Sequence, residues 1–219
     1  MFPVKHFFDE NQERLLISFL NSFQVFLAEK TLEQLFDYTN LVLEGNEKTN
    51  LISKNDGPKF LTRHITDSLI PYIILSKKNK LSPSMKWADM GSGAGCPVFP
   101  LAIACPDIHF YAVEPRAKRI LFLESVKENL NLKNITIVGK RFETSEINHC
   151  DIISCRALST FENDWQRAKP ALRQHGLFVT LKSFESVREL QETPHTEIVK
   201  YSLPEETQNY ALVIRGYYE

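Results

Sequence analysis

The chain has 219 residues, of which 43% are hydrophobic and 24% are charged, a balance typical of a globular protein with a sizeable core rather than a disordered tail or a coiled coil. This length favours one catalytic-size domain with an appendage. The 26 Lys and Arg nearly cancel the 27 Asp and Glu, so the net charge gives no general reason to expect binding to nucleic acid or to an anionic membrane. Residues 51–141 nevertheless carry 14 basic and 7 acidic side chains, so positive charge is concentrated in the middle of the chain.

Several classes of protein are disfavoured by what the sequence lacks. No apolar run approaches the roughly 18 residues needed to cross a bilayer. The first residues show no basic segment followed by a long apolar one, so we expect no secretory signal and a cytoplasmic protein. The four cysteines contain no Cys-x-x-Cys pair, and the six histidines are scattered without ligand-like spacing. We therefore expect reduced thiols and no bound metal.

The N-terminal part of the chain has the periodicity of helices. Apolar residues over 11–27 recur at helical intervals and predict an amphipathic helix. We expect its apolar face to pack on a β-sheet formed by the later part of the chain. A capping-box sequence beginning at Thr31 predicts a second helix, which Gly45 is expected to end. A third helix is predicted over 60–73, kinked or ended near Pro71.

A different rhythm follows a polar, turn-rich stretch near residue 80. Short apolar runs predict strands at 86–90, 109–113, 135–138, 151–154 and 177–181. Helical patterns at 117–130 and 164–172, and a helix opened by Pro97, lie between them, which implies right-handed crossovers and a parallel sheet covered on both faces. Two last strands, 197–202 and 210–214, have no helix between them and predict an antiparallel hairpin. We therefore expect an N-terminal helical extension over 1–80 and an α/β domain with a Rossmann-like, mainly parallel sheet over 81–219.

The first predicted strand runs directly into a turn with glycines at alternate positions, Gly91, Gly93 and Gly95. Glycine adopts positive φ and allows a ligand to touch the backbone where a strand turns into a helix beneath a nucleotide. Nineteen residues beyond Gly95, Glu114 ends the second strand, where a carboxylate can accept hydrogen bonds from ribose hydroxyls. Together these residues predict a ligand that contains adenosine.

The spacing of the glycines distinguishes between adenosine cofactors. A dinucleotide fingerprint that starts at Gly91 requires a glycine where Cys96 stands, which weakens the interpretation as a nicotinamide oxidoreductase. The form Asp-x-Gly-x-Gly-x-Gly with an acid at the next strand end resembles instead the class I methyltransferases, which bind S-adenosylmethionine. A turn that merely packs a strand against a helix is the remaining alternative.

Six segments in a fixed order resemble one bacterial family, the small-subunit ribosomal RNA guanine-N7 methyltransferases, also called the glucose-inhibited division protein B family. The resemblance extends from about residue 49 to residue 183, and the combination is more specific than any one motif. The segments are Thr49–Leu51, Arg63–Leu69, Asp89–Pro97, Ala117–Leu123, Ser154–Ala157 and Leu181-Lys182. The resemblance implies a methyl donor, S-adenosylmethionine, and a substrate, a guanine of 16S rRNA.

The resemblance also implies cofactor contacts, to which the turn and the ribose argument add two more. The expected cofactor-binding residues are Gly91, Gly93, Cys96, Glu114, Phe142, Glu143 and Arg156. The family usually has Phe at the position of Cys96 and Gly at that of Val98, so the pocket wall is reshaped here. It commonly has Asp-Ser where this chain has Glu114-Pro115, which lengthens the carboxylate and removes a backbone donor.

The implied chemistry requires little of the protein. Guanine N7 has a lone pair and no proton, so it attacks a sulfonium methyl directly and no general base is needed. The rate enhancement then comes from placement, and Arg156 is the candidate catalytic residue that orients the base or a phosphate. For RNA binding we select Arg63, Lys118 and Arg119, because basic side chains bind phosphates without reading sequence. The expected partner is 16S rRNA, free or in the 30S subunit, bound by a monomer.

Two other features have a structural interpretation. His64 and Asp67 are three residues apart on a predicted helix, and we interpret them as a structural hydrogen bond or cap rather than a catalytic pair. Cys96 is interpreted as a small hydrophobic residue lining the pocket, not as a nucleophile. Two further functions stay open: a methyltransferase that acts on a protein or a small molecule, and a nucleotide-binding scaffold without turnover.

Overall fold

The computed structural model describes residues 7–53 and 55–218, whose strands form one seven-stranded sheet. The expectation about a secretory signal concerns a segment that includes residues 1–6, outside these ranges. The strands are β1 Lys86–Met90, β2 His109–Val113, β3 Ile135–Val138, β4 Cys150–Arg156, β5 Leu172–Ser183, β6 Thr196–Ser202 and β7 Asn209–Gly216. Their order is β3-β2-β1-β4-β5-β7-β6, with β7 antiparallel to both neighbours and the other pairs parallel. The predicted Rossmann-like sheet with a C-terminal antiparallel hairpin is confirmed.

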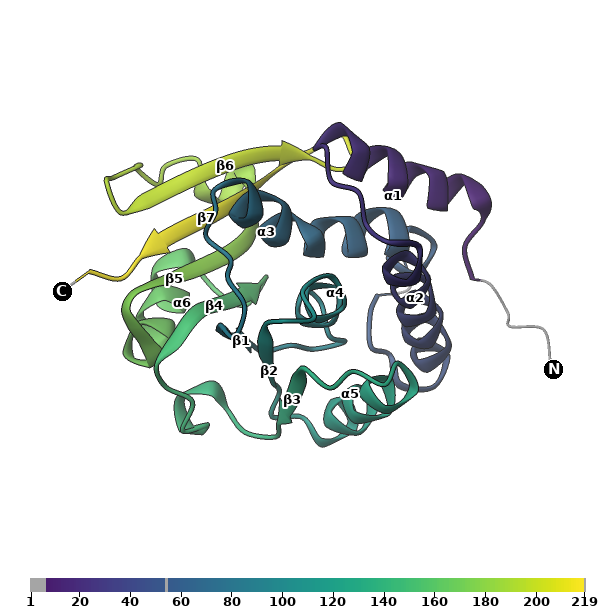
Figure 1. The fold of residues 1–219 in the computed structure, drawn as a ribbon, viewed down its shortest axis with the longest axis horizontal. Helices are drawn as coiled ribbons and strands as arrows, with labels where there is room; N and C mark the ends of the chain where they lie inside the picture. Colours follow the sequence, from purple (N-terminus) through teal and green to yellow (C-terminus); the bar gives the residue numbers. More distant parts are fainter. Residues whose placement is uncertain (1–6, 54, 219) are drawn as a thin grey trace.

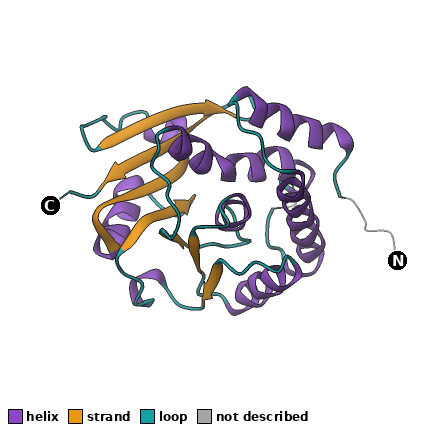
Figure 2. Cartoon of the chain, in the orientation of Figure 1, coloured by secondary structure: helices purple, strands orange, loops and turns teal. Residues whose placement is uncertain are grey.

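Helices cover both faces of this sheet. They are α1 Glu10–Ser22, α2 Glu29–Thr49, α3 Thr66–Lys77, α4 Val98–Ala104, α5 Ala117–Asn129 and α6 Phe161–Ala168, and α3 is preceded by a π-helical segment, Phe60–Ile65. Figure 1 shows α3, α4 and α5 on one side of the sheet, with α2 outside them, and α6 on the opposite side. The same three-layer arrangement is clear when the chain is coloured by secondary structure (Figure 2).

Alternate strand residues serve the two faces. Trp87 and Phe110 are buried in a core that also contains the buried residues of the N-terminal helices. Ala88 and Met90 point to the opposite face, where they share a second core with Trp165 of α6. The helical extension is therefore packed into the same core as one face of the sheet, and the boundary after residue 80 stays a prediction.

The first helix is shorter than its apolar pattern predicts. Asp9 caps it, accepting a hydrogen bond from the Gln12 N–H at 2.9 Å, and the helix ends at Ser22 rather than at residue 27. Phe26 is one of the apolar residues over 11–27 that were expected on the buried face of this helix, but it lies beyond the helix end and is 79% exposed, so that expectation was wrong for Phe26. α1 also does not lie on the sheet: it packs on the π-helical segment, at the outer edge of the molecule (Figure 1).

The second helix both begins and ends elsewhere than predicted. It starts at Glu29, without a capping box at Thr31, and it continues through Gly45 to Thr49. A Cβ at Gly45 would lie 2.7 Å from Phe122 Cε2 of α5. The glycine thus allows two helices to approach closely and does not mark a helix end, because tertiary packing here outweighs local propensity.

Two prolines are placed differently from the prediction relative to the ends of helices. Pro71 lies inside α3, which neither ends nor begins there, and Pro97 stands just before α4 rather than in its first turn. Later boundaries differ from the predicted ones by a few residues. The helix predicted over 164–172 is α6, which ends at Ala168, and β5 begins at Leu172. Among the residues described, none of the helices combines the length and the apolar character that crossing a bilayer requires.

Candidate cofactor and substrate site

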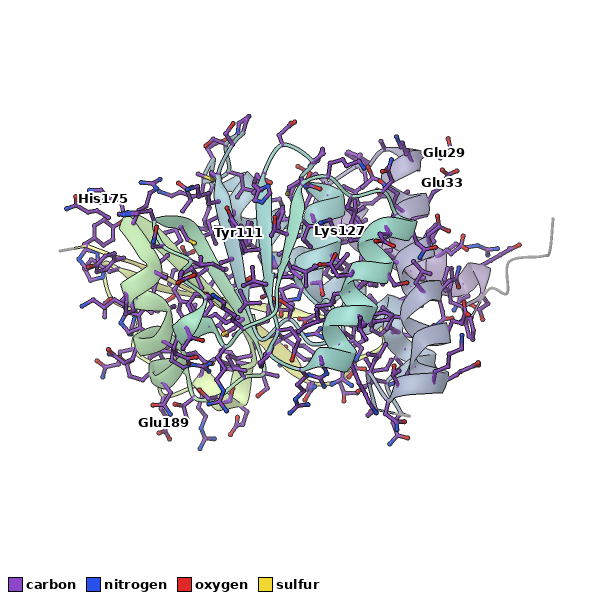
Figure 3. All side chains as sticks on the ribbon, turned by 90° about the horizontal axis from the view of Figure 1, so that it is seen from below. Glu29, Glu33, Tyr111, Lys127, His175 and Glu189 are labelled. Carbon is purple, nitrogen blue, oxygen red and sulfur yellow. The ribbon has the colours of Figure 1, made fainter. Side chains whose placement is uncertain are left out.

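Two cavities open at the edge of the sheet where the parallel strands end. In Figure 3, His175, near the start of β5, marks the side of the sheet where the parallel strands begin, and Glu189, beyond the end of β5, marks the side where they end. The first cavity, of about 550 Å³, lies beside the glycine turn and is lined by residues that include Gly91, Pro115 and Phe142. The second cavity, of about 500 Å³, lies between β4, β5 and α3 and is lined by residues that include Arg156 and Lys182. Ligand sites of α/β sheets are formed at this edge.

The three glycines of the turn have different roles. All have positive φ: +72° at Gly91, +59° at Gly93 and +102° at Gly95. A Cβ at Gly95 would lie 2.7 Å from Phe99 and 2.8 Å from the Tyr38 hydroxyl, so this glycine is required for packing. A Cβ at Gly93 would meet its nearest neighbour only at 3.6 Å. A side chain at Gly93 would therefore make ordinary van der Waals contacts and meet no steric clash.

Glu114 fastens the turn to the end of β2. The side chain is buried, Oε2 accepts a hydrogen bond from the Gly93 N–H at 3.0 Å, and Oε1 accepts one from the Arg116 N–H at 2.9 Å. Arg119 Nη1 lies 3.6 Å from Oε2. A carboxylate has roughly four lone-pair sites, so acceptor capacity remains for a hydroxyl of a ligand.

Phe142 and Glu143 follow β3 and lie on the wall of the first cavity. Phe142 is buried, whereas the Glu143 carboxylate pairs with Arg167 of α6. Hydrogen bonding to the backbone and to Arg167 lowers the pKa of Glu143. The structure thus brings three of the predicted cofactor-binding residues, Gly91, Phe142 and Glu143, together around one cavity.

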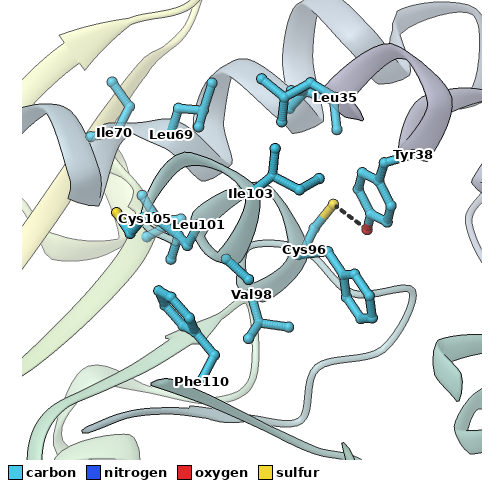
Figure 4. Close-up of a cluster of buried hydrophobic side chains, with 14 of the residues drawn as sticks. Leu35, Tyr38, Leu69, Ile70, Cys96, Val98, Leu101, Ile103, Cys105 and Phe110 are labelled. Atoms are coloured by element: carbon cyan, nitrogen blue, oxygen red, sulfur yellow. Dashed lines mark hydrogen bonds between the residues drawn. The ribbon is translucent and has the colours of Figure 1, made fainter. Parts of the chain in front are cut away.

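Cys96 lies in the hydrophobic core on the far side of the turn. Its Sγ is 3.4 Å from the Tyr38 hydroxyl, which donates a hydrogen bond to the Ala94 carbonyl at 2.9 Å (Figure 4). Burial raises the pKa of the Cys96 thiol, so the thiol is un-ionised at neutral pH. This environment agrees with a small hydrophobic residue, while a contact between Cys96 and a cofactor stays a prediction.

Arg156 is the last residue of β4 and points into the second cavity. Its Nη1 lies 3.4 Å from Asp67 Oδ2, and the Tyr201 hydroxyl donates a hydrogen bond to Asp67 Oδ1. The Arg156 side chain lines this cavity and is 20% exposed. Burial raises the pKa of Asp67 even though the nearby Arg156 favours its carboxylate.

His64 and Asp67 do not pair with each other as predicted. Asp67 faces Arg156, whereas His64 Nε2 lies 3.2 Å from Asp56 Oδ1. Burial, reinforced by the positive charge of Arg156, lowers the pKa of His64 to about 4. The imidazole is therefore neutral at pH 7, and both residues line the second cavity.

Asp89 lies beneath the glycine turn and has an unused acceptor. Its Oδ1 accepts a hydrogen bond from Ser154 Oγ at 2.8 Å, but Oδ2 has no partner among the described residues. The side chain is 1% exposed, and burial raises its pKa to about 6. A buried carboxylate oxygen without a donor is costly, so this position is suited to a donor group of a ligand.

Lys182 and Asp164 hold the chain segment that follows β4. Lys182 Nζ lies 2.8 Å from Asp164 Oδ2 and also donates to the Ser159 carbonyl. Ser159 Oγ donates to Asp164 Oδ1 at 2.6 Å. Residues 157–159 are thereby fixed beside the second cavity by a buried ion pair.

The family model for rRNA small subunit methyltransferase G, GidB, matches residues 31–214. The chain belongs to this family. It is thus an rRNA methyltransferase, and the predictions of the family and of the enzyme class are confirmed.

Curated relatives match over most of their own length. The ribosomal RNA small subunit methyltransferase G of Wolinella succinogenes is 33% identical over 173 residues, which are 79% of this chain and 86% of that protein. The protein of the same name from Photobacterium profundum is 30% identical over 206 residues, 91% of this chain and 96% of that protein. These matches extend beyond the segments that carried the resemblance.

Solved structures share the fold at low sequence identity. TrmN from Thermus thermophilus superposes with a TM-score of 0.51 at 14% identity, covering 71% of this chain and 53% of that one. A human methyltransferase 10 domain containing protein gives a TM-score of 0.50 at 16% identity, covering 68% and 82%. The GidB-family sheet is therefore of the kind found in other methyltransferases.

The basic residues of this GidB-family protein are placed differently relative to the two cavities, and neither Lys118 nor Arg119 is among the lining residues of either one. Arg63 lines the second cavity and pairs with Asp56 at 3.0 Å, and Lys118 is exposed at the start of α5. Arg119 is engaged with Glu114 over the turn. Arg116 and Arg141 are basic residues of the same middle segment but are not among the three selected from the sequence; both are exposed and both lie on the wall of the first cavity. Their position next to Pro115 and Phe142 was the available signal.

Proposed function

We propose that this protein transfers the methyl group of S-adenosylmethionine to N7 of a guanine in 16S rRNA. The observation that carries the proposal is the position of the glycine turn of this GidB-family chain, with Gly91 on the wall of the first cavity and the second cavity close by at the same sheet edge. One cavity can take the nucleoside of a donor while the other admits a base.

The residues present fit a donor made of adenosine and an amino acid. Glu114 has acceptor capacity left for ribose hydroxyls, and Phe142 provides an apolar wall for a purine. The unpartnered Oδ2 of Asp89 supplies an acceptor for an ammonium or hydroxyl donor. When bound, S-adenosylmethionine supplies an electrophilic sulfonium methyl group.

The second cavity provides orientation rather than proton transfer. Guanine N7 has no proton to lose, and His64 is neutral at pH 7 with its pKa near 4. Arg156 lines this cavity, and a guanidinium donates bidentate hydrogen bonds to a guanine edge. We assign to Arg156 the role of orienting the base, because placement supplies most of the rate in such a displacement.

Phosphate binding is assigned to the basic residues at the rim of the cavities. Arg63, Lys118 and Arg119 are joined in this role by Arg116 and Arg141, which line the first cavity. The substrate is 16S rRNA, free or in the 30S subunit, and the protein acts on it as a monomer in the cytoplasm. The affinity for RNA should fall steeply with salt concentration, since counterions are released on binding.

The test uses methyl-labelled S-adenosylmethionine and 30S subunits or 16S rRNA that lack the modification. We expect label in the RNA and chain cleavage specific for 7-methylguanine at a single position. Label in a protein fraction would favour a protein methyltransferase, and binding of the donor without transfer to either fraction would favour a scaffold. Arg156→Ala should lose transfer, and transfer at the wild-type rate would remove Arg156 from the mechanism.

A further inference from the structure

Leu158 stands between the two cavities. It lies two residues beyond the end of β4 and is the single described residue that lines both of them. The side chain is partly exposed and packs at the rim of the core beneath α6. An apolar side chain in this position separates the space beside the glycine turn from the space beside Arg156.

Contact with the glycine turn makes this separation tight. A Cβ at Gly91 would lie 3.0 Å from Leu158 Cδ1, which is closer than the optimal separation of carbon atoms, about 3.5–4.0 Å. The Leu158 side chain therefore rests directly on the backbone of Gly91. No atom of a ligand fits between the two residues while Leu158 stays in this position.

The backbone holds Leu158 in place from both sides. Ala157 has φ +49°, in the left-handed region, which turns the chain so that the next side chain faces the glycine turn. Ser159 is bound to Asp164 through its N–H at 3.2 Å and its Oγ at 2.6 Å. The segment that carries the Leu158 side chain is therefore fixed at the residue that follows it.

We propose that Leu158 is a positioning residue for the methyl donor, which it contacts where the donor passes from the first cavity into the second. This inference rests on the proposed function, because it requires a donor with its nucleoside in one cavity and its reacting end in the other. Such a donor displaces the Leu158 side chain from Gly91. Leu158 then packs on the donor, excludes water and fixes the direction of the reacting end.

The experiment compares a ligand that occupies one cavity with a ligand that spans both. Adenosine, titrated to millimolar concentration, and S-adenosylhomocysteine are measured by isothermal titration calorimetry on wild-type protein and on Leu158→Trp. We expect the adenosine Kd to change by less than about twofold and the S-adenosylhomocysteine Kd to rise at least about tenfold, because the larger side chain fills the passage that S-adenosylhomocysteine has to cross. Leu158→Met, which keeps the volume, should bind both ligands as wild type does.

A matched control and a second variant keep the test independent of folding. Leu121→Trp places the same side chain on α5, where the residue is 72% exposed, and should leave both affinities unchanged. If Leu158→Trp does not fold, Leu158→Ala replaces it. This variant removes three side-chain carbon atoms that would contact the donor, so we expect the affinity for S-adenosylhomocysteine to fall about threefold or more and the affinity for adenosine to stay unchanged.

The outcomes separate the two proposals. Equal losses for both ligands, or no loss for either, would overturn the role of Leu158, since a merely structural residue does not discriminate between them. A wild-type protein that binds S-adenosylhomocysteine but not adenosine would also overturn it. A wild-type protein that binds neither ligand would instead refute the proposed cofactor.

Discussion

Arg156 Nη1 lies 3.4 Å from Asp67 Oδ2, although the two residues are 89 positions apart in the sequence. Asp67 belongs to α3 in the helical extension, Arg156 ends β4, and the other oxygen of the carboxylate accepts a hydrogen bond from Tyr201 of β6. One buried carboxylate thus joins the helices, the parallel strands and the C-terminal hairpin. The wall of the second cavity depends on it.

Replacement of Asp67 by Asn should loosen this junction. Asp67→Asn removes the charge that pairs with Arg156 and weakens the acceptor for Tyr201, so we expect the free energy of unfolding to fall by about 1–3 kcal/mol. Urea denaturation measures the change. Tyr201→Phe should cost about 1 kcal/mol, and the double variant less than the sum, because both changes act on the same carboxylate. Strictly additive losses would show that the residues are not coupled.

Asp89 and His64 should give the stability opposite dependences on pH. Burial raises the pKa of Asp89 from 3.8 to about 6, so the folded state holds the proton more tightly and the stability contribution is lost as pH rises from about 4 to 6. Burial lowers the pKa of His64 from 6.5 to about 4, so its stability contribution is lost as pH falls through the same window. In the wild-type protein the two slopes oppose each other.

Asp89→Asn should expose this opposition. The difference in free energy of unfolding between the variant and wild type should shift in favour of the variant as pH rises from 4 to 6. Above this range it should level off about 1–3 kcal/mol above its value near pH 4, since one pKa unit is worth about 1.4 kcal/mol. Under the proposed function, in which Oδ2 accepts a hydrogen bond from the ligand, the same variant should bind S-adenosylhomocysteine more weakly. His64→Gln should show the mirror-image pH profile. A stability difference between Asp89→Asn and wild type that does not vary with pH would contradict the assignment.

The sheet could be predicted from the sequence because its strands are short apolar runs bounded by turn residues. The glycine turn and Glu114 could also be predicted, because the first strand, the turn and the acid at the end of the second strand follow one another at fixed spacing. The sheet then brings the two strand ends together. Gly45 could not be interpreted locally, since its reason is the ring of Phe122 on another helix. Phe26 continues the apolar period, yet the helix that would have buried it ends at Ser22.

The partners of site residues were beyond the reach of a sequence pattern. Arg156 was selected, but Asp67 and Tyr201 reach it only through the tertiary fold. Leu158 is a single apolar residue in a loop and carries no periodicity. What could be predicted was therefore the chemistry at strand ends, and what could not was the set of long-range contacts that orients it.

The third glycine of the turn should be required for stability more than for binding. In Gly95→Ala the new Cβ meets Phe99 and the Tyr38 hydroxyl below 3.0 Å at a φ of +102°, so we expect a loss of about 2–4 kcal/mol from overpacking and backbone strain together. In Gly93→Ala the new Cβ makes only ordinary van der Waals contacts, the nearest at 3.6 Å, and the variant should cost about 1 kcal/mol from backbone strain alone. The relation should reverse for S-adenosylhomocysteine, because the proposed function places Gly93 against the ligand. Urea denaturation and calorimetry on both variants measure the two effects.

Glu114→Gln should separate the structural role of this residue from binding. The amide retains one oxygen, so it can satisfy the Gly93 N–H or the Arg116 N–H but not both, and Arg119 loses its counter-charge. We expect the free energy of unfolding to fall by about 1–3 kcal/mol and S-adenosylhomocysteine to bind about tenfold more weakly. Glu146→Gln, in an exposed pair with Lys140, is the matched control and should change neither by a measurable amount. If Glu114→Gln matched this control in both measurements, neither the hold on the turn nor the ribose contact could be assigned to Glu114.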